Sequence, residues 1–318
     1  MLVIDAVRTR ASLSFDRLIP ALREAFIRGA ETPFRHRHDQ PQPDGSTAAL
    51  LLMPAWRRVG YTGVKLVTVF PGNSARSLPA VSSSYLLCDG ETGRHLALID
   101  GTEITGRRTA AASALAGSFL ARPDASRLLV VGAGHVAGLM PAAYAAVRPI
   151  REVRVWNVRP ARAERLAASL REEGFDATPA ADLAAAVAEA DIISCATLSR
   201  DALVQGEWLR RGAHVDLIGG FTPVMREVDD DAIRRARVFI DTDAALAEAG
   251  DLIQPLASGA LRREDICGDL AQLCRGDLGG RRSASEITLF KSVGSALEDL
   301  AAAALAYEDA QRVTSTSP

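Results

Sequence analysis

A glycine-rich turn separates an apolar run from a helical pattern in LLVVGAGHVAG, residues 128–138. Gly132, Gly134 and Ala137 form the pattern G-x-G-x-x-A directly after a strand and at the start of a helix. Glycine at the first position permits the tight turn, and glycine at the second lets the backbone approach a pyrophosphate. The free amides at the start of the helix then face that anion. The segment therefore predicts a dinucleotide-binding turn.

The end of the next strand pattern bears on which dinucleotide binds. NAD-preferring sites usually end this strand with Asp or Glu, which binds the ribose 2′-hydroxyl. This chain has Asn157 in VRVWNVRPAR, followed by Arg159 and Arg162. Asparagine with nearby arginines accepts a 2′-phosphate, whereas a carboxylate would repel it. We therefore predict NADPH, with NADH as the alternative, because solvent-facing arginines at a helix start would give the same pattern.

A lysine within an apolar strand pattern is the third feature that suggests chemistry. The chain has 37 lysine and arginine residues, and only Lys65 and Lys291 are lysines. The alternation in YTGVKLVTVF places Lys65 on the face opposite Val64 and Leu66. A charge on the inner face of a sheet is costly unless it is paired, so we expect a substrate or protein carboxylate beside Lys65. The alternative is a surface lysine on an edge strand; for Lys291 we expect no role in the chemistry.

The elements that must position these residues begin with a β-rich first third. Residues 15–29 have helical spacing, and a Pro- and His-rich loop follows over 32–46. Four strand patterns separated by turn signals come next, at 47–54, 61–70, 80–89 and 95–101. Together they indicate an antiparallel sheet.

The remainder of the chain has a different pattern. An alanine-rich helix runs from Arg108, and from residue 127 apolar strand patterns alternate with helical ones. This alternation is typical of a parallel doubly wound sheet, so the fold class is α/β. A long helix beginning near residue 294 ends the pattern.

Bulk properties exclude several classes of protein. The 318 residues are 48% hydrophobic and 24% charged with a net charge of −2, which argues against nucleic-acid binding. No apolar run approaches the roughly 20 residues of a membrane span, and the N-terminus lacks the pattern of a signal peptide. The four cysteines form no C-x-x-C pair and the five histidines have no zinc-ligand spacing. We expect a cytoplasmic protein with reduced thiols, no metal and no membrane partner.

Several segments together resemble the ornithine cyclodeaminase/mu-crystallin family. They are LLLMP (50–54), GVKLVTVFPGN (63–73), DGTEITGRRTAAASALA (100–116), VVGAGHVA (130–137), IGGFTPVMREVD (218–229) and FKSVGSALEDLA (290–301). The resemblance covers nearly the whole chain and implies a Rossmann-type dinucleotide-binding domain over 119–298. It also implies a β-rich substrate-binding domain, formed by 1–118 and 299–318, through which homodimers are built.

The resemblance further implies which residues bind ligands. In the family, the lysine of the GxK strand and the arginine of RTAA bind the substrate carboxylate, and these positions match Lys65 and Arg108. An arginine in the loop before the LMP strand joins them, which is Arg35 here, with Arg37 as its rival. The predicted cofactor-binding residues are Gly132, Gly134, His135, Val136, Asn157, Arg159, Thr197, Phe221, Ser292 and Val293.

Two positions depart from the family's cyclodeaminases. Those enzymes resemble one another in a glutamate just before LMP and an aspartate after GG, where this chain has Leu51 and Phe221. Cyclisation of ornithine needs an acceptor for the distal ammonium and a base for the loss of ammonia, and both carboxylates are missing here. GGFTPVMRE resembles instead the family's ketimine reductases, which reduce delta-1-pyrroline-2-carboxylate and delta-1-piperideine-2-carboxylate to proline and pipecolate.

We therefore predict an NADPH-dependent reductase of a cyclic imino acid, whose carboxylate is held by Lys65, Arg108 and Arg35. Protonation of the imine nitrogen makes C2 electrophilic, and the candidates for the proton donor are ordered water, Lys65 and Asp216. Two alternatives stay open, an amino-acid cyclodeaminase and a non-catalytic NADPH-binding protein of the mu-crystallin kind.

Overall fold

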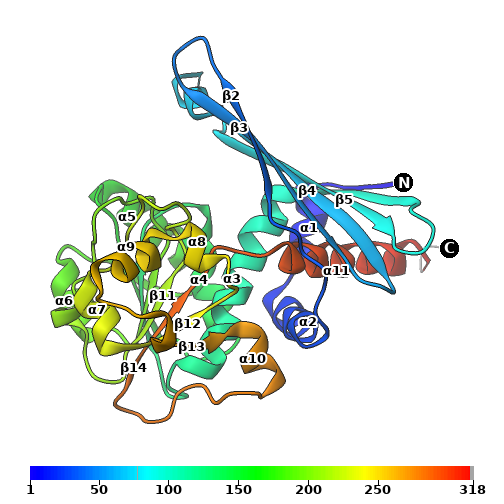
Figure 1. Cartoon of the computed structure of the whole chain (residues 1–318). Helices are drawn as coiled ribbons and strands as arrows, with labels where there is room; N and C mark the ends of the chain where they lie inside the picture. The colour runs from blue at the N-terminus through cyan, green and yellow to red at the C-terminus, as the bar shows by residue number, and fades with distance from the viewer. Residues whose placement is uncertain (77, 316–318) are drawn as a thin grey trace. The chain divides into compact units, whose positions relative to one another are not determined.

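The computed structural model describes residues 1–76 and 78–315 (Figure 1). The chain divides into two compact units: unit 1 is residues 1–108 with the segment from 295 to the C-terminus, and unit 2 is residues 109–294. The family resemblance implies boundaries after residues 118 and 298. Helix α3 (Gly101–Leu120) is continuous through the observed boundary. Its sequence therefore carries no break that marks where unit 2 begins.

Unit 1 contains a six-stranded mixed sheet with the order β1-β6-β5-β4-β3-β2. Its strands are β1 (Leu2–Ile4), β2 (His36–Pro41), β3 (Thr47–Trp56), β4 (Tyr61–Val69), β5 (Val81–Asp89) and β6 (His95–Asp100). β1 pairs in parallel with β6, and the other neighbours pair antiparallel. A short 3-10 helix, η1 (Pro71–Arg76), follows β4. In Figure 1, β2 and β3 extend as an arm well beyond the helices of unit 1.

Two strands of this sheet were missed by the sequence analysis. The predicted loop over 32–46 contains β2, so that prediction was wrong there. All six residues of β2 are exposed, which leaves no alternation of polar and apolar residues to identify it. The strand forms because it pairs along its whole length with β3. The short strand β1 was likewise not predicted.

The inner face of this sheet is covered by helices. Helix α11 (Ala296–Ser315) packs against β3, β4 and β5, and against α1 (Ala6–Ser12) and α2 (Phe15–Arg28). Paired residues form one buried row across five strands, namely Ile4, Ile99, Tyr85, Lys65 and Met53. The sheet therefore points one charged side chain into an otherwise apolar layer.

Unit 2 is a parallel sheet of eight strands in the order β13-β12-β14-β11-β10-β7-β8-β9. The strands are β7 (Arg127–Val131), β8 (Glu152–Trp156), β9 (Asp176–Pro179), β10 (Ile192–Cys195), β11 (His214–Leu217), β12 (Ala236–Ile240), β13 (Ile266–Asp269) and β14 (Ile287–Lys291). All neighbouring strands pair in parallel. The predicted doubly wound α/β class is confirmed.

Helices and short 3-10 turns connect these strands. The helices are α4 (His135–Ala145), α5 (Pro160–Glu172), α6 (Leu183–Glu189), α7 (Asp230–Arg235), α8 (Ala245–Glu248), α9 (Gly250–Ser258) and α10 (Leu270–Arg275), and the 3-10 turns are η2 (Gly206–Trp208) and η3 (Arg263–Asp265). Strand β14 was not predicted, although it lies inside the sheet and all five of its residues are buried.

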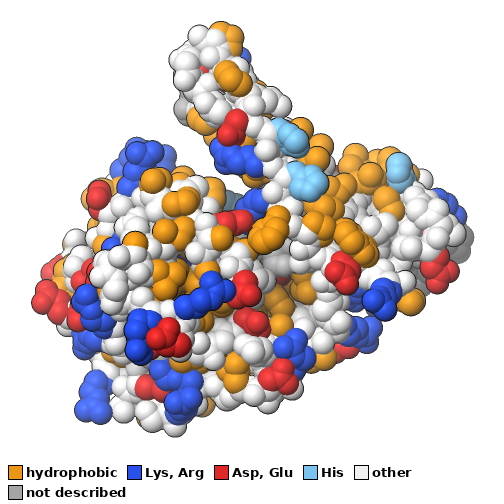
Figure 2. Space-filling model, viewed as in Figure 1, with side chains coloured by type: hydrophobic (Ala, Val, Ile, Leu, Met, Phe, Trp, Pro, Cys, Tyr) orange, Lys and Arg blue, Asp and Glu red, His pale blue; other side chains and the backbone are white. Residues whose placement is uncertain are grey.

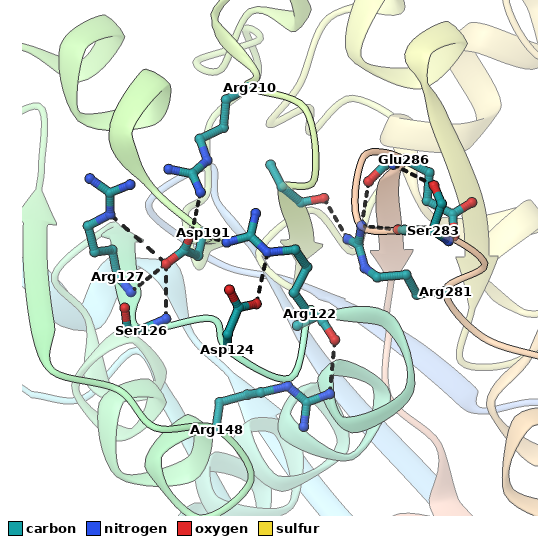
Figure 3. Close-up of polar contacts among 12 residues, drawn as sticks. Arg122, Asp124, Ser126, Arg127, Arg148, Asp191, Arg210, Arg281, Ser283 and Glu286 are labelled. Atoms are coloured by element: carbon teal, nitrogen blue, oxygen red, sulfur yellow. Dashed lines mark hydrogen bonds and ion pairs between the residues drawn. The ribbon is translucent and has the colours of Figure 1, made fainter.

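The amino-terminal edge of the unit 2 sheet is held together by Asp191 (Figure 3). One carboxylate oxygen accepts hydrogen bonds from the backbone amides of Ser126 and Arg127, each at 2.9 Å. Arg122 and Arg210 donate to the other oxygen, at 2.8 and 2.6 Å. These contacts tie the starts of β7 and β10. Ligands of open α/β sheets bind at the opposite, carboxyl-terminal edge, where other groups hold the loops.

The surface carries both signs of charge. Figure 2 shows acidic and basic side chains interspersed over the viewed face, with no large area of one sign. Within residues 1–76 and 78–315, no helix is both long and apolar enough to cross a membrane.

Candidate active site

Lys65 lies on the inner face of β4 in unit 1 and is 2% exposed. Its cross-strand neighbours are Met53 and Tyr85, which are also buried. Its Nζ lies 2.9 and 2.8 Å from the two carboxylate oxygens of Asp299, in the first turn of α11. Leu66, the next residue, is 42% exposed. The predicted inward direction of Lys65 is confirmed, and the alternative of a surface lysine is excluded.

Arg108, on α3, binds the same aspartate. Its Nε donates to Oδ1 of Asp299 at 2.9 Å, and its Nη1 donates to Oε2 of Glu298 at 2.9 Å. We call Lys65, Arg108, Glu298 and Asp299 the Lys65 cluster. All four side chains are buried, and two cations balance two carboxylates. The carboxylates lie in the first turn of α11, where the helix dipole favours negative charge.

Burial changes the ionisation of this cluster. It lowers the pKa of Lys65 to about 8, an effect that Asp299 opposes and the charge of Arg108 strengthens. Burial alone would raise the pKa of Asp299, but the adjacent Lys65 and Arg108 outweigh it and hold that pKa below its ordinary value. Lys65 and Asp299 are therefore both charged at neutral pH, and Lys65 begins to lose its proton in the mildly alkaline range.

The two rival arginines of the predicted site lie at the start of β2. Arg35 directly precedes the strand and is half-buried. Arg37 is on the strand, exposed, and its Nε donates to Asp39 at 2.8 Å. Leu51 is the residue opposite Arg37 in the register of β2 and β3. An apolar side chain thus occupies the position at which the resemblance implies a glutamate in the cyclodeaminases.

The glycine turn of unit 2 has the geometry of an anion cradle. Gly132 follows β7 with φ +119°, and a Cβ there would lie 2.6 Å from the carbonyl oxygen of Ala196. Gly134 is the N-cap of α4, with no side chain capping the helix and nothing within 4 Å of an added Cβ. His135 and Val136 begin that helix, so their amides lie in its uncapped first turn. This open, uncapped start fits a dinucleotide pyrophosphate.

The end of β8 presents arginine to solvent. Asn157 follows the strand, and its Nδ2 donates to the carbonyl oxygen of Arg159 at 3.1 Å. Arg159 is the N-cap of α5 with φ −107° and ψ 98°, and Pro160 follows at the first helical position. Arg159 and Arg162 are both exposed. The extended backbone keeps Arg159 at the strand end, clear of the body of the helix.

The other predicted cofactor residues follow the carboxyl ends of three neighbouring strands. Thr197 follows β10, Phe221 follows β11 and is 46% exposed, and Ser292 and Val293 follow β14. These strands are adjacent in the order β14-β11-β10. The backbone amide of Val293 is held at 2.8 Å by Asp241, which is buried. The fold thus brings these segments to the edge of the sheet at which open α/β sheets bind ligands.

The profile of the ornithine cyclodeaminase/mu-crystallin family matches residues 1–314. The chain belongs to this family.

Relatives within the family are similar over nearly their whole length. Delta(1)-pyrroline-2-carboxylate reductase of Paracoccus denitrificans is 43% identical over 283 residues, which are 86% of this chain and 89% of that protein. The solved structure of Thermococcus litoralis Delta(1)-pyrroline-2-carboxylate reductase with NADH and L-proline has a TM-score of 0.92 and 33% identity, covering 99% and 98% of the two chains. An archaeal alanine dehydrogenase dimer with bound NAD has a TM-score of 0.90 and 29% identity, covering 99% and 97%.

A second group of buried charges, in unit 2, was missed by the sequence analysis of this family member. Lys291 at the end of β14 is fully buried, and its Nζ donates to Asp251 on α9 at 2.9 Å. Glu227 is also fully buried, and its backbone amide donates to Asp251 at 2.7 Å. We call Lys291, Asp251 and Glu227 the Lys291 cluster. The rarity of lysine and the charged residues of VMREVD were the only signals in the sequence.

Asp216, the candidate proton donor, is enclosed within unit 2. Its carboxylate accepts hydrogen bonds from the hydroxyls of Ser113 at 3.0 Å and Ser194 at 2.8 Å, and it is fully buried. Burial raises its pKa to about 6, although these hydrogen bonds oppose the shift. The amides of the following loop donate to Glu227, a partner that the sequence did not reveal.

Proposed function

We propose that this protein reduces the C=N bond of a cyclic imino acid, delta-1-pyrroline-2-carboxylate or delta-1-piperideine-2-carboxylate, to proline or pipecolate. The observation that carries the proposal is the buried pair Lys65 and Arg108, held 2.9 Å from Asp299 in a member of this family. Buried cations of this kind suit a substrate carboxylate. The Paracoccus and Thermococcus relatives are both named Delta(1)-pyrroline-2-carboxylate reductase.

Charge balance in the Lys65 cluster favours one ionisation state of the substrate. The cluster has two cations and two carboxylates, so it is already neutral. A protonated cyclic imine with its carboxylate adds no net charge to this buried place, whereas an anion would add an uncompensated charge. The distal ammonium of ornithine would need a further carboxylate, and the matching positions are Leu51 and Phe221. The cluster therefore suits an iminium carboxylate better than a diamino acid.

Each part of the chain has a defined task in this mechanism. A bound nicotinamide dinucleotide supplies the hydride. Lys65 and Arg108, with Arg35, bind the substrate carboxylate and thereby orient C2 of the ring. Asp299 and Glu298 keep the cations in position and the cluster neutral. The uncapped start of α4 binds the pyrophosphate. Positioning and preorganised charge are thus the main contributions of the protein.

We further propose that NADPH is the preferred cofactor, with NADH as the alternative. Asn157 supplies no carboxylate to bind the free ribose hydroxyls, and Arg159 is exposed at the same strand end. A guanidinium there suits a 2′-phosphate. The Thermococcus relative was solved with NADH, which supports NADH as the alternative.

A homodimer built through unit 1 is also part of the proposal. The outer face of the sheet carries an apolar row across five strands, namely Val3, Leu98, Leu86, Val64 and Pro54. Val3 is 66% exposed and Leu98 is 37% exposed, so the row faces solvent in the single chain. Large apolar surfaces of this kind usually mark an interface.

A cytoplasmic location is also proposed. The four cysteines, none of them in a disulfide, fit the reducing cytoplasm.

One spectrophotometric experiment separates the candidate functions. The protein is given delta-1-pyrroline-2-carboxylate and NADPH or NADH, and oxidation of the cofactor is followed. We expect oxidation that depends on the imine. Release of ammonia from ornithine without net cofactor change would instead identify a cyclodeaminase. Cofactor oxidation with pyruvate and ammonia would identify an amino-acid dehydrogenase, the second candidate suggested by the archaeal alanine dehydrogenase. Cofactor binding without any of these activities would leave a binding protein.

A further inference from the structure

We propose that the Lys291 cluster positions the two loops of unit 2 that receive the cofactor, and that it thereby sets cofactor affinity and turnover. The inference rests on the proposed function, because it assigns residues to the same cofactor site. Its three members lie beneath the loops and do not themselves belong to the predicted cofactor-binding set.

Glu227 ties the two loops to each other. Its Oε1 accepts hydrogen bonds from the backbone amide and the hydroxyl of Thr197, both at 2.8 Å. Its Oε2 accepts from the amides of Gly219 at 2.9 Å and Gly220 at 3.4 Å. Thr197 follows β10 and the two glycines follow β11, which are neighbouring strands. One carboxylate thus fixes two loops at the carboxyl edge of the sheet.

Asp251 and Lys291 fix Glu227 in turn. The Oδ1 of Asp251 accepts from the backbone amide of Glu227 at 2.7 Å, and its Oδ2 accepts from Nζ of Lys291 at 2.9 Å. All three side chains are 0% exposed. The order of contacts therefore runs from Lys291 through Asp251 and Glu227 to the loops. Buried polar groups connected in this way are rigid, because each lost contact would leave an unsatisfied charge.

The glycine pair of the second loop fits tightly over these charges. A Cβ at Gly219 would lie 1.9 Å from the carbonyl oxygen of Thr197 and 2.5 Å from Oε1 of Glu227. A Cβ at Gly220 would lie 2.6 Å from Oδ2 of Asp251 and 3.3 Å from Nζ of Lys291. Neither position has room for a side chain. The two glycines of IGGFTP therefore pack directly against the Lys291 cluster.

The cluster carries more negative than positive charge, since one lysine faces two carboxylates. Burial raises the pKa of Glu227 to about 7, with Lys291 opposing that shift and Asp251 adding to it. Cys195 and Asp216 are the other buried titratable groups that interact with the cluster. A carboxylate that accepts four hydrogen bonds from two loops holds a specific arrangement, which suits a positioning role.

Two variants test the proposal. Glu227→Gln keeps the size of the side chain but replaces one accepting oxygen with an NH2 group, which can only donate, so the two hydrogen bonds to that position are lost. The double variant Lys291→Met with Asp251→Asn removes the supporting pair together, so that neither of these two residues is left as a charge without its partner. We expect dinucleotide Kd, measured by fluorescence titration, to rise about tenfold and kcat to fall by a similar factor. KM for the imine, which binds at the Lys65 cluster, should stay within about twofold.

Asp191→Asn is the matched control. Asp191 is a buried carboxylate in the same sheet, and it also joins two loops through backbone amides, but at the amino-terminal edge. We expect this variant to lower Tm while leaving Kd for the dinucleotide unchanged. If the cluster variants lower Tm in the same way and leave Kd and kcat unchanged, the cluster is structural only and the proposal is overturned.

The remaining outcomes are also decisive. Failure of both cluster variants to fold, with Asp191→Asn folded, would assign the cluster to stability and overturn the proposal. Because Kd is measured without an imine, a protein that binds dinucleotide but reduces no imine would contradict the proposed function. The changes in Kd would still decide the role of the cluster.

Discussion

Lys65 in unit 1 and Lys291 in unit 2 are both buried on strands, and each has its Nζ 2.9 Å from an aspartate. Their surroundings differ. In the Lys65 cluster, Asp299 binds only side chains, those of Lys65 and Arg108. In the Lys291 cluster, Asp251 and Glu227 accept most of their hydrogen bonds from backbone amides. Side-chain pairs can exchange partners when a ligand arrives, whereas backbone contacts fix the chain.

The comparison also explains why lysine is kept at two positions in an arginine-rich chain. An ammonium is a compact charge with three donors, whereas a guanidinium needs a planar space. Lys65 sits in a row between Met53 and Tyr85, and Lys291 lies 3.3 Å from where a Cβ of Gly220 would be. Both positions are crowded, so each fits a compact ammonium on an unbranched side chain better than a planar guanidinium.

Among the variants that test the different roles of the two clusters, Lys65→Met should have the largest effect. It removes a charged hydrogen bond to the substrate carboxylate, so kcat/KM for the imine should fall by about 30- to 1,000-fold, or roughly 2–4 kcal/mol. Dinucleotide Kd should change by less than about twofold, in contrast to the variants of the Lys291 cluster. Steady-state kinetics and fluorescence titration measure the two quantities. Wild-type turnover in Lys65→Met would remove Lys65 from the site.

Asp216 is a further buried carboxyl group, and it differs from those of both clusters because its partners are hydroxyls. Its pKa is raised to about 6 from 3.8, so its effect should be seen in the pH dependence of stability. A carboxyl group whose pKa is higher in the folded state stabilises the fold fully at pH values below its unfolded-state pKa. This contribution is lost as pH rises through its folded-state pKa. Between about pH 4 and pH 6 the free energy of unfolding should therefore lose about 2–3 kcal/mol from this group. Asp216→Asn should abolish that loss. Urea unfolding of both proteins across this range measures it, and equal slopes would contradict the assignment.

The cofactor end of unit 2 gives the next largest effect. Arg159→Ala should reduce a preference for NADPH over NADH by about tenfold to a hundredfold, the value of a charged contact to phosphate. Asn157→Asp should reverse the preference, because a carboxylate repels the 2′-phosphate and binds the free hydroxyls. The comparison is of kcat/KM with the two cofactors in the three proteins. A wild type that already prefers NADH would make Arg159 an ordinary surface residue.

The smallest effect concerns pH at the Lys65 cluster. Substrate binding needs protonated Lys65, whose pKa is lowered to about 8, so kcat/KM should fall as pH rises above that value. Asp299→Asn removes the carboxylate that opposes this lowering. The alkaline limb should then move to lower pH by about one unit. An ionisation of the imine itself would leave the limb at the same pH in both proteins, which distinguishes the two causes. Circular dichroism checks that the variant is folded.

Local sequence was enough for the features whose cause is local. The alternation around Lys65 predicted its burial, and the spacing of Gly132 and Gly134 predicted the turn before α4. The exposed strand β2 was missed because its only cause is pairing with β3. The partner of Lys65 lies 234 residues away, and Glu227 meets Asp251 across 24 residues. Contacts of this kind arise from the topology, and no spacing in the sequence encodes them.

The burial of both lysines has a practical consequence for amine chemistry. Lys65 is 2% exposed and Lys291 is 0% exposed. An amine-reactive dye should therefore react with neither lysine of the folded chain. Unfolding uncovers both amines, so the number of dyes on lysine per chain, read by mass spectrometry, would count the molecules that have unfolded. A protein with so few lysines reports its own denaturation through its labelling stoichiometry.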